Sequence, residues 1–308
     1  MTDAPAERTR ASPEPVRGTR GRARVVPWWF IAPAAVIYCF VTVVPDVQAM
    51  AYSLTDWNGL ANHFSFIGLT NYVSAFENPN FVKGLVNTVA LTIMITLAQL
   101  VIGLLLALAL STRLKSKTVL RTLFFTPVVL TSVAVGYIWK FLYAPTGAIN
   151  QILDAIGLHA LAHDWLGDPS VNLWSIAVMC VWQSAGVTMV IFIAGLEGID
   201  SETLEAAHLD GANGWQRFWY VIRPLLAPAV LINSLLCVIG GLKIFDQIFI
   251  TTQGGPARST ATLATMSYTD GFVAGDYSYG ITLSIILAVL VGAVSIVQFR
   301  MTRTKENR

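Results

Sequence analysis

The chain has 308 residues, of which 55% are hydrophobic and only 12% are charged, and its formal net charge is +2. A soluble domain carries roughly 25% charged residues, so this composition, with a mean hydropathy of +0.61, excludes an ordinary soluble globular protein. The three cysteines lie in apolar stretches without CxxC spacing, which predicts neither a disulfide framework nor a zinc site; they are Cys39, Cys180 and Cys237.

The first 26 residues contain six arginines, several prolines and glycines, and no aromatic residue. Such a segment has too little apolar surface to bury a core, so we predict a disordered basic tail over 1–26. The apolar run from Trp28 to about Tyr52 is longer than the apolar region of a signal peptide. It is therefore expected to be an uncleaved first membrane span.

Six stretches approach the length of about 20 mostly apolar residues that a membrane-spanning helix needs. The third contains Pro127 and Gly136, which membrane helices tolerate when neighbouring groups satisfy the freed backbone. The sequence thus predicts an all-α integral membrane protein with six transmembrane helices. These lie at roughly 28–52, 86–110, 119–142, 172–195, 225–250 and 278–299, giving a transmembrane domain over 27–300 and a short tail over 301–308.

The basic residues predict the orientation, because cytoplasmic connections of membrane proteins are enriched in lysine and arginine. Sixteen of the 20 basic residues lie in the two tails, in the connection after span two, or in the connection after span four. Both termini are therefore expected to be cytoplasmic. The other four are Lys83, Lys140, Lys243 and Arg258.

The cytoplasmic segment 197–224 between spans four and five has the pattern of two short helices. Asp200 or Ser201 can cap the first helix, and Gly211 can end it in a left-handed conformation. An aromatic-rich second helix, from Trp215 to Ile222, then leads into Pro224.

This segment resembles the signature loop of ABC importer permeases. It reads Glu205-Ala206-Ala207, three residues, Gly211, nine residues, then hydrophobic Val221 and Pro224. Asp210 and Phe218 match the carbohydrate subset, the maltose-type and glycerol-phosphate-type permeases, whereas Arg223 stands where leucine is usual. Other segments are similar to the first of the two permeases in those systems: 52–57, 66–72, Phe245-Asp246 and Gly254-Gly255-Pro256.

The resemblance implies the partners and the division of labour. The chain has no GxxxxGK[ST] phosphate loop and no HExxH or GxSxG motif, so we expect no ATPase or other catalytic site in it. In the resembled family, ATP and Mg are bound by a dimer of separate ATPase subunits, a second homologous permease completes the pore, and an extracellular solute-binding protein delivers the solute. The implied location is the bacterial plasma membrane, with the lipid bilayer and no nucleic acid as surroundings. The residues implied to couple to the ATPase subunit are Glu205, Ala206, Ala207, Asp210, Gly211 and Pro224.

Polar or small residues inside spans four and five are candidates for the substrate pathway, because polar groups are costly in a membrane. An indole can stack on a sugar and an amide can bind its hydroxyls, while hydrogen bonds between helices are the alternative. The candidates are Trp182, Gln183, Ser184, Gly240, Gly241 and Ile244. A polar stripe in span two is interpreted as subunit packing, and the four histidines lack the spacing of metal ligands. The stripe is Asn87, Thr88, Thr92, Thr96 and Gln99.

The predicted function is translocation of a sugar or related polyol, coupled to ATP hydrolysis in other subunits. An ATP-independent secondary transporter or channel is the alternative, and it would give the segment 197–224 no role. Mono-, di- and oligosaccharides and glycerol phosphate all remain open as solutes.

Overall fold

A computed structural model describes residues 28–61, 63–112 and 115–306, with the backbone alone for 301–306. These residues are helical and form no β-strand; an isolated antiparallel bridge joins Thr55 to Phe66. The predicted all-α class is confirmed. The predicted basic tail, 1–26, lies outside the described residues.

Five helices among the described residues are long and apolar enough to cross a membrane, and one bent pair of helices would make a sixth. Each of the six predicted stretches falls on one of them. In chain order they are Ala32–Tyr52, Pro79–Leu110, the pair Lys117–Val129 and Ser132–Leu142, Asn172–Glu197, Ala227–Thr251, and Tyr277–Arg300.

The first helix contains α1 (Ala32–Tyr38), a π-helical stretch (Cys39–Val43) and α2 (Val44–Tyr52). The chain divides into two units between Val47 and Gln48. The larger unit holds every helix from α3 onwards.

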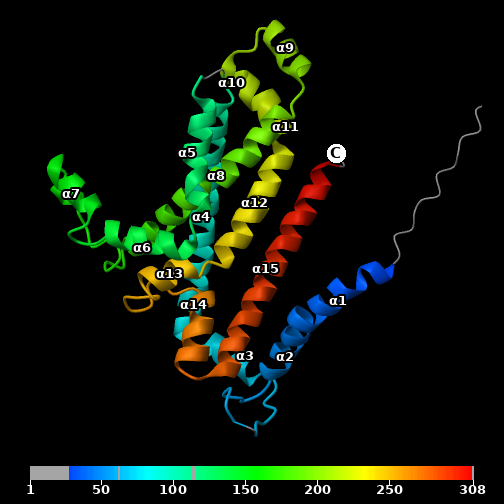
Figure 1. The fold of residues 1–308 in the computed structure, drawn as a ribbon, viewed down its shortest axis with the longest axis vertical. Coiled ribbons are helices and arrows are strands. Elements are labelled where there is room, and N and C mark those ends of the chain that lie inside the picture. The colour runs from blue at the N-terminus through cyan, green and yellow to red at the C-terminus, as the bar shows by residue number, and fades with distance from the viewer. Residues whose placement is uncertain (1–27, 62, 113–114, 307–308) are drawn as a thin grey trace, which may run out of the picture. The chain divides into compact units, whose positions relative to one another are not determined.

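Two long helices, α4 (Pro79–Leu110) and α8 (Asn172–Glu197), form the centre of the larger unit (Figure 1). Glycines let their neighbours approach closely, as is common between membrane helices. A β-carbon on Gly103 of α4 would lie 2.5 Å from the Thr188 side chain of α8. A β-carbon on Gly186 of α8 would lie 2.5 Å from the Phe124 carbonyl oxygen of α5 (Lys117–Val129). Glycine at these two positions therefore sets how closely α8 packs against α4 and α5.

The third predicted span is not one continuous helix. It consists of α5 and α6 (Ser132–Leu142), which meet at an angle of 98°. Leu130 and Thr131 between them are extended, and the Thr131 hydroxyl accepts a hydrogen bond from the Ala134 N–H at 3.3 Å. Because this side chain caps a new helix, α6 starts in a new direction at Ser132, five residues after Pro127.

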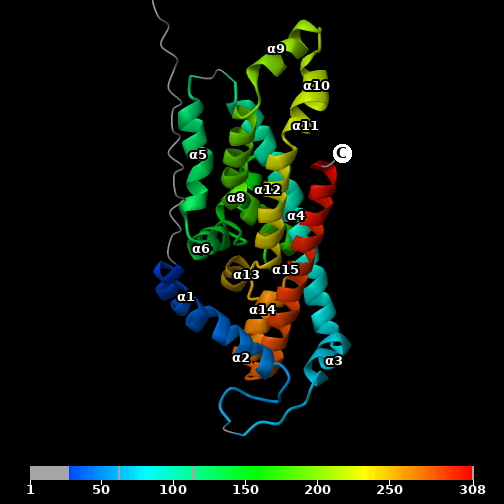
Figure 2. The same cartoon turned by 90° about the vertical axis from the view of Figure 1, so that its right-hand side faces the viewer.

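The fifth span is also interrupted. Helix α12 (Ala227–Leu242) ends before Lys243, and α13 (Asp246–Thr251) begins three residues later. Helices α6 and α13 pack on each other: a β-carbon on Gly136 would lie 3.0 Å from Ile250, and the Lys140 ammonium donates to the Ile250 carbonyl at 3.2 Å. We call these two helices the α6–α13 layer. Figure 2 shows the layer at the ends of α5 and α12 that are remote from α9 (Ser201–Leu209).

The polar stripe of α4 is buried inside the chain, so its interpretation as subunit packing is wrong. The Asn87 amide donates to the Ala261 carbonyl at 3.0 Å, and the Thr88 hydroxyl accepts the Leu263 N–H at 3.0 Å. The segment before α14 (Leu263–Tyr268) folds back onto α4, and its backbone groups need these partners. The remaining described helices are α3 (Thr70–Glu77), α7 (Ala148–Ala155), α10 (Gly214–Arg217), α11 (Arg223–Leu225) and α15 (Tyr277–Glu306).

Candidate functional site

The segment 197–224 forms two short helices that project beyond the ends of the long helices (Figure 1). The Asp200 carboxylate accepts the Glu202 N–H at 3.1 Å and so caps α9. Gly211 follows this helix with a φ of 78°, in the left-handed region that glycine adopts without strain. Asn213 and Gln216 then make a capping box at the start of α10. The helix, turn and second helix predicted from the sequence are confirmed.

Helix α10 continues through a π-helical stretch (Phe218–Ile222) and α11 into α12. Arg223, which departs from the usual pattern, lies with its guanidinium 4.8 Å from the centre of the Trp219 ring. The charge therefore has a cation–π partner within the same segment.

The projecting segment exposes large apolar side chains. Leu209 is 87% exposed, Trp215 70% and Tyr220 80%. Exposed apolar groups gathered on one element mark interaction sites, and the sequence reasoning did not single out Leu209 or Tyr220. Their signal was the presence of a leucine and a tyrosine in a connection outside the spans, where no membrane core would cover them. Of the predicted coupling residues, Ala207 is half-buried, while Glu205, Ala206, Asp210, Gly211 and Pro224 are exposed.

An ion pair at the base of this segment joins two spans. Arg121 near the start of α5 lies 3.0 Å from Glu197, the last residue of α8. Both side chains are partly exposed, so the pair contributes little to stability. It does show that the connections after span two and after span four lie at the same end of the larger unit.

A polar cavity of about 610 Å³ lies between α4, α8, α12 and the break before α13. Helix α6 contributes its first residue, Ser132. The cavity wall carries hydroxyl, amide, ammonium and carboxylate groups, which can donate to and accept from a hydroxylated solute. The polar lining residues are Gln99, Ser132, Ser184, Thr188, Asn233, Lys243, Asp246 and Gln247.

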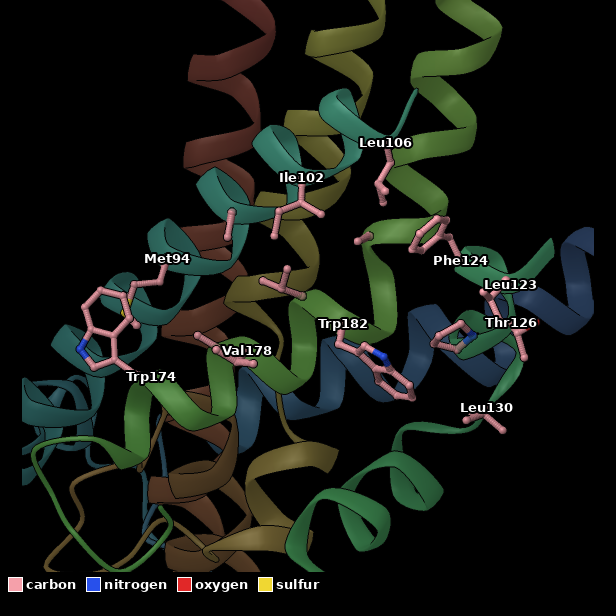
Figure 3. A pocket seen from close by; sticks show the side chains of 15 residues that line it. Met94, Ile102, Leu106, Leu123, Phe124, Thr126, Leu130, Trp174, Val178 and Trp182 are labelled. Carbon is pink, nitrogen blue, oxygen red and sulfur yellow. The ribbon is translucent and has the colours of Figure 1, made fainter. Parts of the chain in front are cut away.

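Four of the six predicted pathway residues line this cavity: Ser184, Gly240, Gly241 and Ile244. Trp182 does not. It is 41% exposed and lines a separate apolar groove of about 690 Å³ between α4, α5 and α8 (Figure 3). The structure therefore does not bring Trp182 together with the cavity residues as one sugar-binding pair.

Gln183 is 7% exposed, and its amide is already engaged. Its Nε2 donates to the Leu130 carbonyl at 3.1 Å, and its Oε1 accepts from Gln247 Nε2 at 3.0 Å. Gln183 therefore joins helices. Among the polar cavity residues that were not predicted for the pathway, Ser132 and Gln247 lie at breaks in helices, which hydropathy does not reveal.

Lys243 and Asp246 have the i, i+3 spacing at which opposite charges can pair on a helix, but they form no ion pair with each other among the described residues. Both are exposed to the cavity. In the part of the chain that the structure describes, no three histidine, cysteine or acidic side chains gather as metal ligands.

Comparison with known proteins identifies the family. Residues 99–303 match the family described as binding-protein-dependent transport system inner membrane component. The chain belongs to this family. It is 32% identical to the multiple sugar-binding transport system permease protein MsmF of Streptococcus mutans, over 91% of this chain and 96% of MsmF. It is 31% identical to the lactose transport system permease protein LacF of Rhizobium radiobacter, over 91% of this chain and 94% of LacF.

The fold of this permease is similar to that of a chain in the crystal structure of a bacterial ABC transporter involved in the import of the acidic polysaccharide alginate. The TM-score is 0.80 at 20% identity, covering 90% of this chain and 94% of the other. The overall fold of this chain is thus one already seen in a solved ABC transporter.

Proposed function

We propose that this chain is one of two translocating subunits of an ATP-driven importer of a sugar or related polyol. The projecting segment carries the proposal: a capped α9, a left-handed glycine turn and a capped α10 lie outside the bundle with exposed apolar side chains. Relatives named as sugar and lactose transport permeases support the solute class.

In this function the projecting segment, Glu197–Pro224, is seated in a groove of an ATPase subunit. Ala206 and Ala207 are small enough for the helix to approach a groove wall, while Leu209 and Trp215 supply apolar contact area. ATP and Mg are held by the ATPase dimer, and a second homologous permease presents the other segment. A movement of the ATPase would reach the bundle through α9, α10 and the start of α12.

The cavity is proposed as part of the solute route. Its one ammonium (Lys243) and one carboxylate (Asp246) balance in charge, and its other polar groups are neutral amides and hydroxyls. That set suits a neutral polyhydroxylated solute, because both a donor and an acceptor are available for each hydroxyl. An extracellular binding protein would deliver the solute to the side remote from α9.

The orientation is part of the proposal. Most basic residues lie in the tails and in the connections at the α9 end, as expected for the cytoplasmic side of a bacterial plasma membrane. Lys117 and Arg121 lie at the start of α5, directly after the connection that follows span two, and Arg121 pairs with Glu197 at the base of the projecting segment.

The test of coupling uses Ala207→Asp and Gly211→Val in the complex purified with the transport proteins encoded beside this chain. The aspartate would bury an unpaired charge at the contact, at a cost of roughly 3–5 kcal/mol. The valine would force a β-branched residue into a left-handed turn. We expect both variants to lose bound ATPase subunit, or to hydrolyse ATP without response to the loaded binding protein.

The matched control is Ala155→Asp, which adds the same charge to the exposed surface of α7, far from the projecting segment in sequence. It should retain the ATPase subunit. Normal ATPase binding and ATP-dependent uptake in both loop variants would contradict the proposal and favour an ATP-independent transporter. The transported sugar would be identified by thermal-shift screening of the neighbouring binding protein against mono-, di- and oligosaccharides.

A further inference from the structure

The two interrupted spans are tied together by one buried side chain. The break in span three frees the Leu130 carbonyl, because the Ala134 N–H that would bind it in a continuous helix is held by the Thr131 hydroxyl instead. Gln183 of α8 donates to this carbonyl at 3.1 Å. The same amide accepts a hydrogen bond from Gln247, the second residue of α13, at 3.0 Å.

The link lies at the wall of the polar cavity. Ser132 follows one break and Gln247 follows the other, and both line the cavity, as does Ser184, the neighbour of Gln183. Beyond the breaks, the α6–α13 layer is held together by Gly136 against Ile250 and by the Lys140 ammonium on the Ile250 carbonyl. The layer can therefore move as one body only if the bonds to Gln183 are released.

We propose that Gln183 is a positioning residue that latches the α6–α13 layer to α8 at the cavity wall, so that this amide restricts access to the cavity from the side remote from α9. A further bond to α8, from the Tyr143 hydroxyl to the Ser175 carbonyl at 3.0 Å, lies at the other end of α6 and away from the two breaks. The proposal rests on the proposed function. It replaces the expectation that Gln183 binds the sugar itself, because both ends of its amide are occupied by protein groups.

The experiment measures access directly and needs no known solute. A Ser184→Cys reporter is placed in a chain whose native cysteines are replaced by serine, in cells that express the whole transport system. A membrane-impermeant maleimide is added outside, and the labelling rate is measured. Gln247→Leu and Gln183→Leu are each introduced into this parent. We expect Gln247→Leu to raise the rate about fivefold, the effect of losing one hydrogen bond. Gln183→Leu loses two hydrogen bonds and should raise the rate further.

Gln247→Leu leaves the bond from Gln183 to Leu130 in place, whereas Gln183→Leu removes both bonds. The double variant should label no faster than Gln183→Leu alone, because the two changes remove a shared contact. A general loss of stability would instead give effects that add.

The matched control is Asn150→Leu. Asn150 is also a buried amide that donates to backbone carbonyls, those of Pro145 and His163, and accepts a side-chain N–H, that of Trp165 at 2.8 Å. It lies in α7, away from both breaks, and should leave the labelling rate at the parent value.

Copurification of the ATPase subunit is measured for every variant. If the Gln247→Leu complex assembles and labels at the parent rate, the proposed latch is wrong. If Gln183→Leu does not assemble, the labelling rate of Gln247→Leu alone tests the latch. A parent chain that binds no ATPase subunit overturns the proposed function as well, so the two failures are distinguishable.

Discussion

Neighbouring glycines in span five have different surroundings. A β-carbon on Gly241 would lie 2.9 Å from the Thr92 backbone of α4, whereas a β-carbon on Gly240 meets no atom within 4 Å. The sequence predicted that both residues lie on a face with little side-chain bulk, which leaves room for a solute or for close helix packing. The structure places open space beside Gly240 and close helix packing beside Gly241.

We therefore expect Gly240→Leu and Gly241→Leu to fail in different ways. Gly240→Leu should fold within about 0.5 kcal/mol of the parent, as surface substitutions do, but raise the apparent KM for sugar uptake because its side chain enters the cavity. Gly241→Leu should cost about 1–3 kcal/mol of stability, since it overpacks a helix contact. Melting temperatures of the purified complexes and uptake kinetics distinguish the two.

Equal stability and equal uptake in the two variants would show that the cavity is not on the solute route. The helical spacing of small residues was enough to predict this face of span five from the sequence. The sequence could not show which of the two glycines packs against α4 and which faces the cavity, because that depends on how α12 is rotated in the bundle. Trp182 and Gln183 illustrate the same limit, since adjacent residues on α8 point into different surroundings.

At the scale of helices, the packing of α5 depends on a close approach to α8. The absence of a side chain at Gly186 leaves room for the backbone of α5. A β-carbon at this position would lie 2.5 Å from the Phe124 carbonyl oxygen and 2.9 Å from the Phe125 α-carbon. Backbone atoms give way less easily than side-chain ends, so even a methyl group would displace α5.

Gly186→Ala is expected to lower the stability of the complex by about 1–3 kcal/mol, seen as a lower melting temperature. Gly198→Ala, next to the end of the same helix, is the control, because its β-carbon would lie no closer than 3.5 Å to the nearest atoms. If Gly186→Ala and the control have the same melting temperature, then α5 does not pack closely against α8 in the assembled protein.

Hydropathy predicted where the apolar segments lie but not that two of them break. Pro127 marked the region of the first break, yet the direction of α6 is set by Thr131, whose hydroxyl caps it, and by the packing of Gly136 on α13. The second break, at Lys243, has no proline. There the Thr262 hydroxyl binds the Ile244 carbonyl at 3.2 Å, a contact between residues 18 apart that no local pattern contains.

At the scale of the whole molecule, the proposed orientation rests on the distribution of basic residues and is open to direct test. We expect single cysteines at Lys117 and Ser201 to react with an impermeant maleimide only when the cytoplasmic side is accessible. Cysteines at Asn80 and Leu161 should react from outside. All four positions are exposed, so a lack of reaction reports the membrane and not burial in the chain.

External labelling of Ser201→Cys in intact cells would reverse the orientation and remove the projecting segment from contact with a cytoplasmic ATPase. The fold class, the spans and the projecting segment could all be predicted because hydropathy, capping residues and a motif are local signals. The cavity could be predicted only in part, since its wall combines four helices and two breaks.

The length of α8 converts small rotations into the loss of specific contacts. Gln183 is fourteen residues from Glu197, a distance of about 21 Å along the helix axis. A tilt of α8 by about 2° around its Glu197 end would shift Gln183 sideways by about 0.7 Å on that geometry. The bond to Leu130 is 3.1 Å long, and a shift of that size along it exceeds the range of about 2.7–3.2 Å that such hydrogen bonds span. A tilt of about 2° is therefore more than enough to break this contact, and it is far smaller than the rotations by which domains usually move.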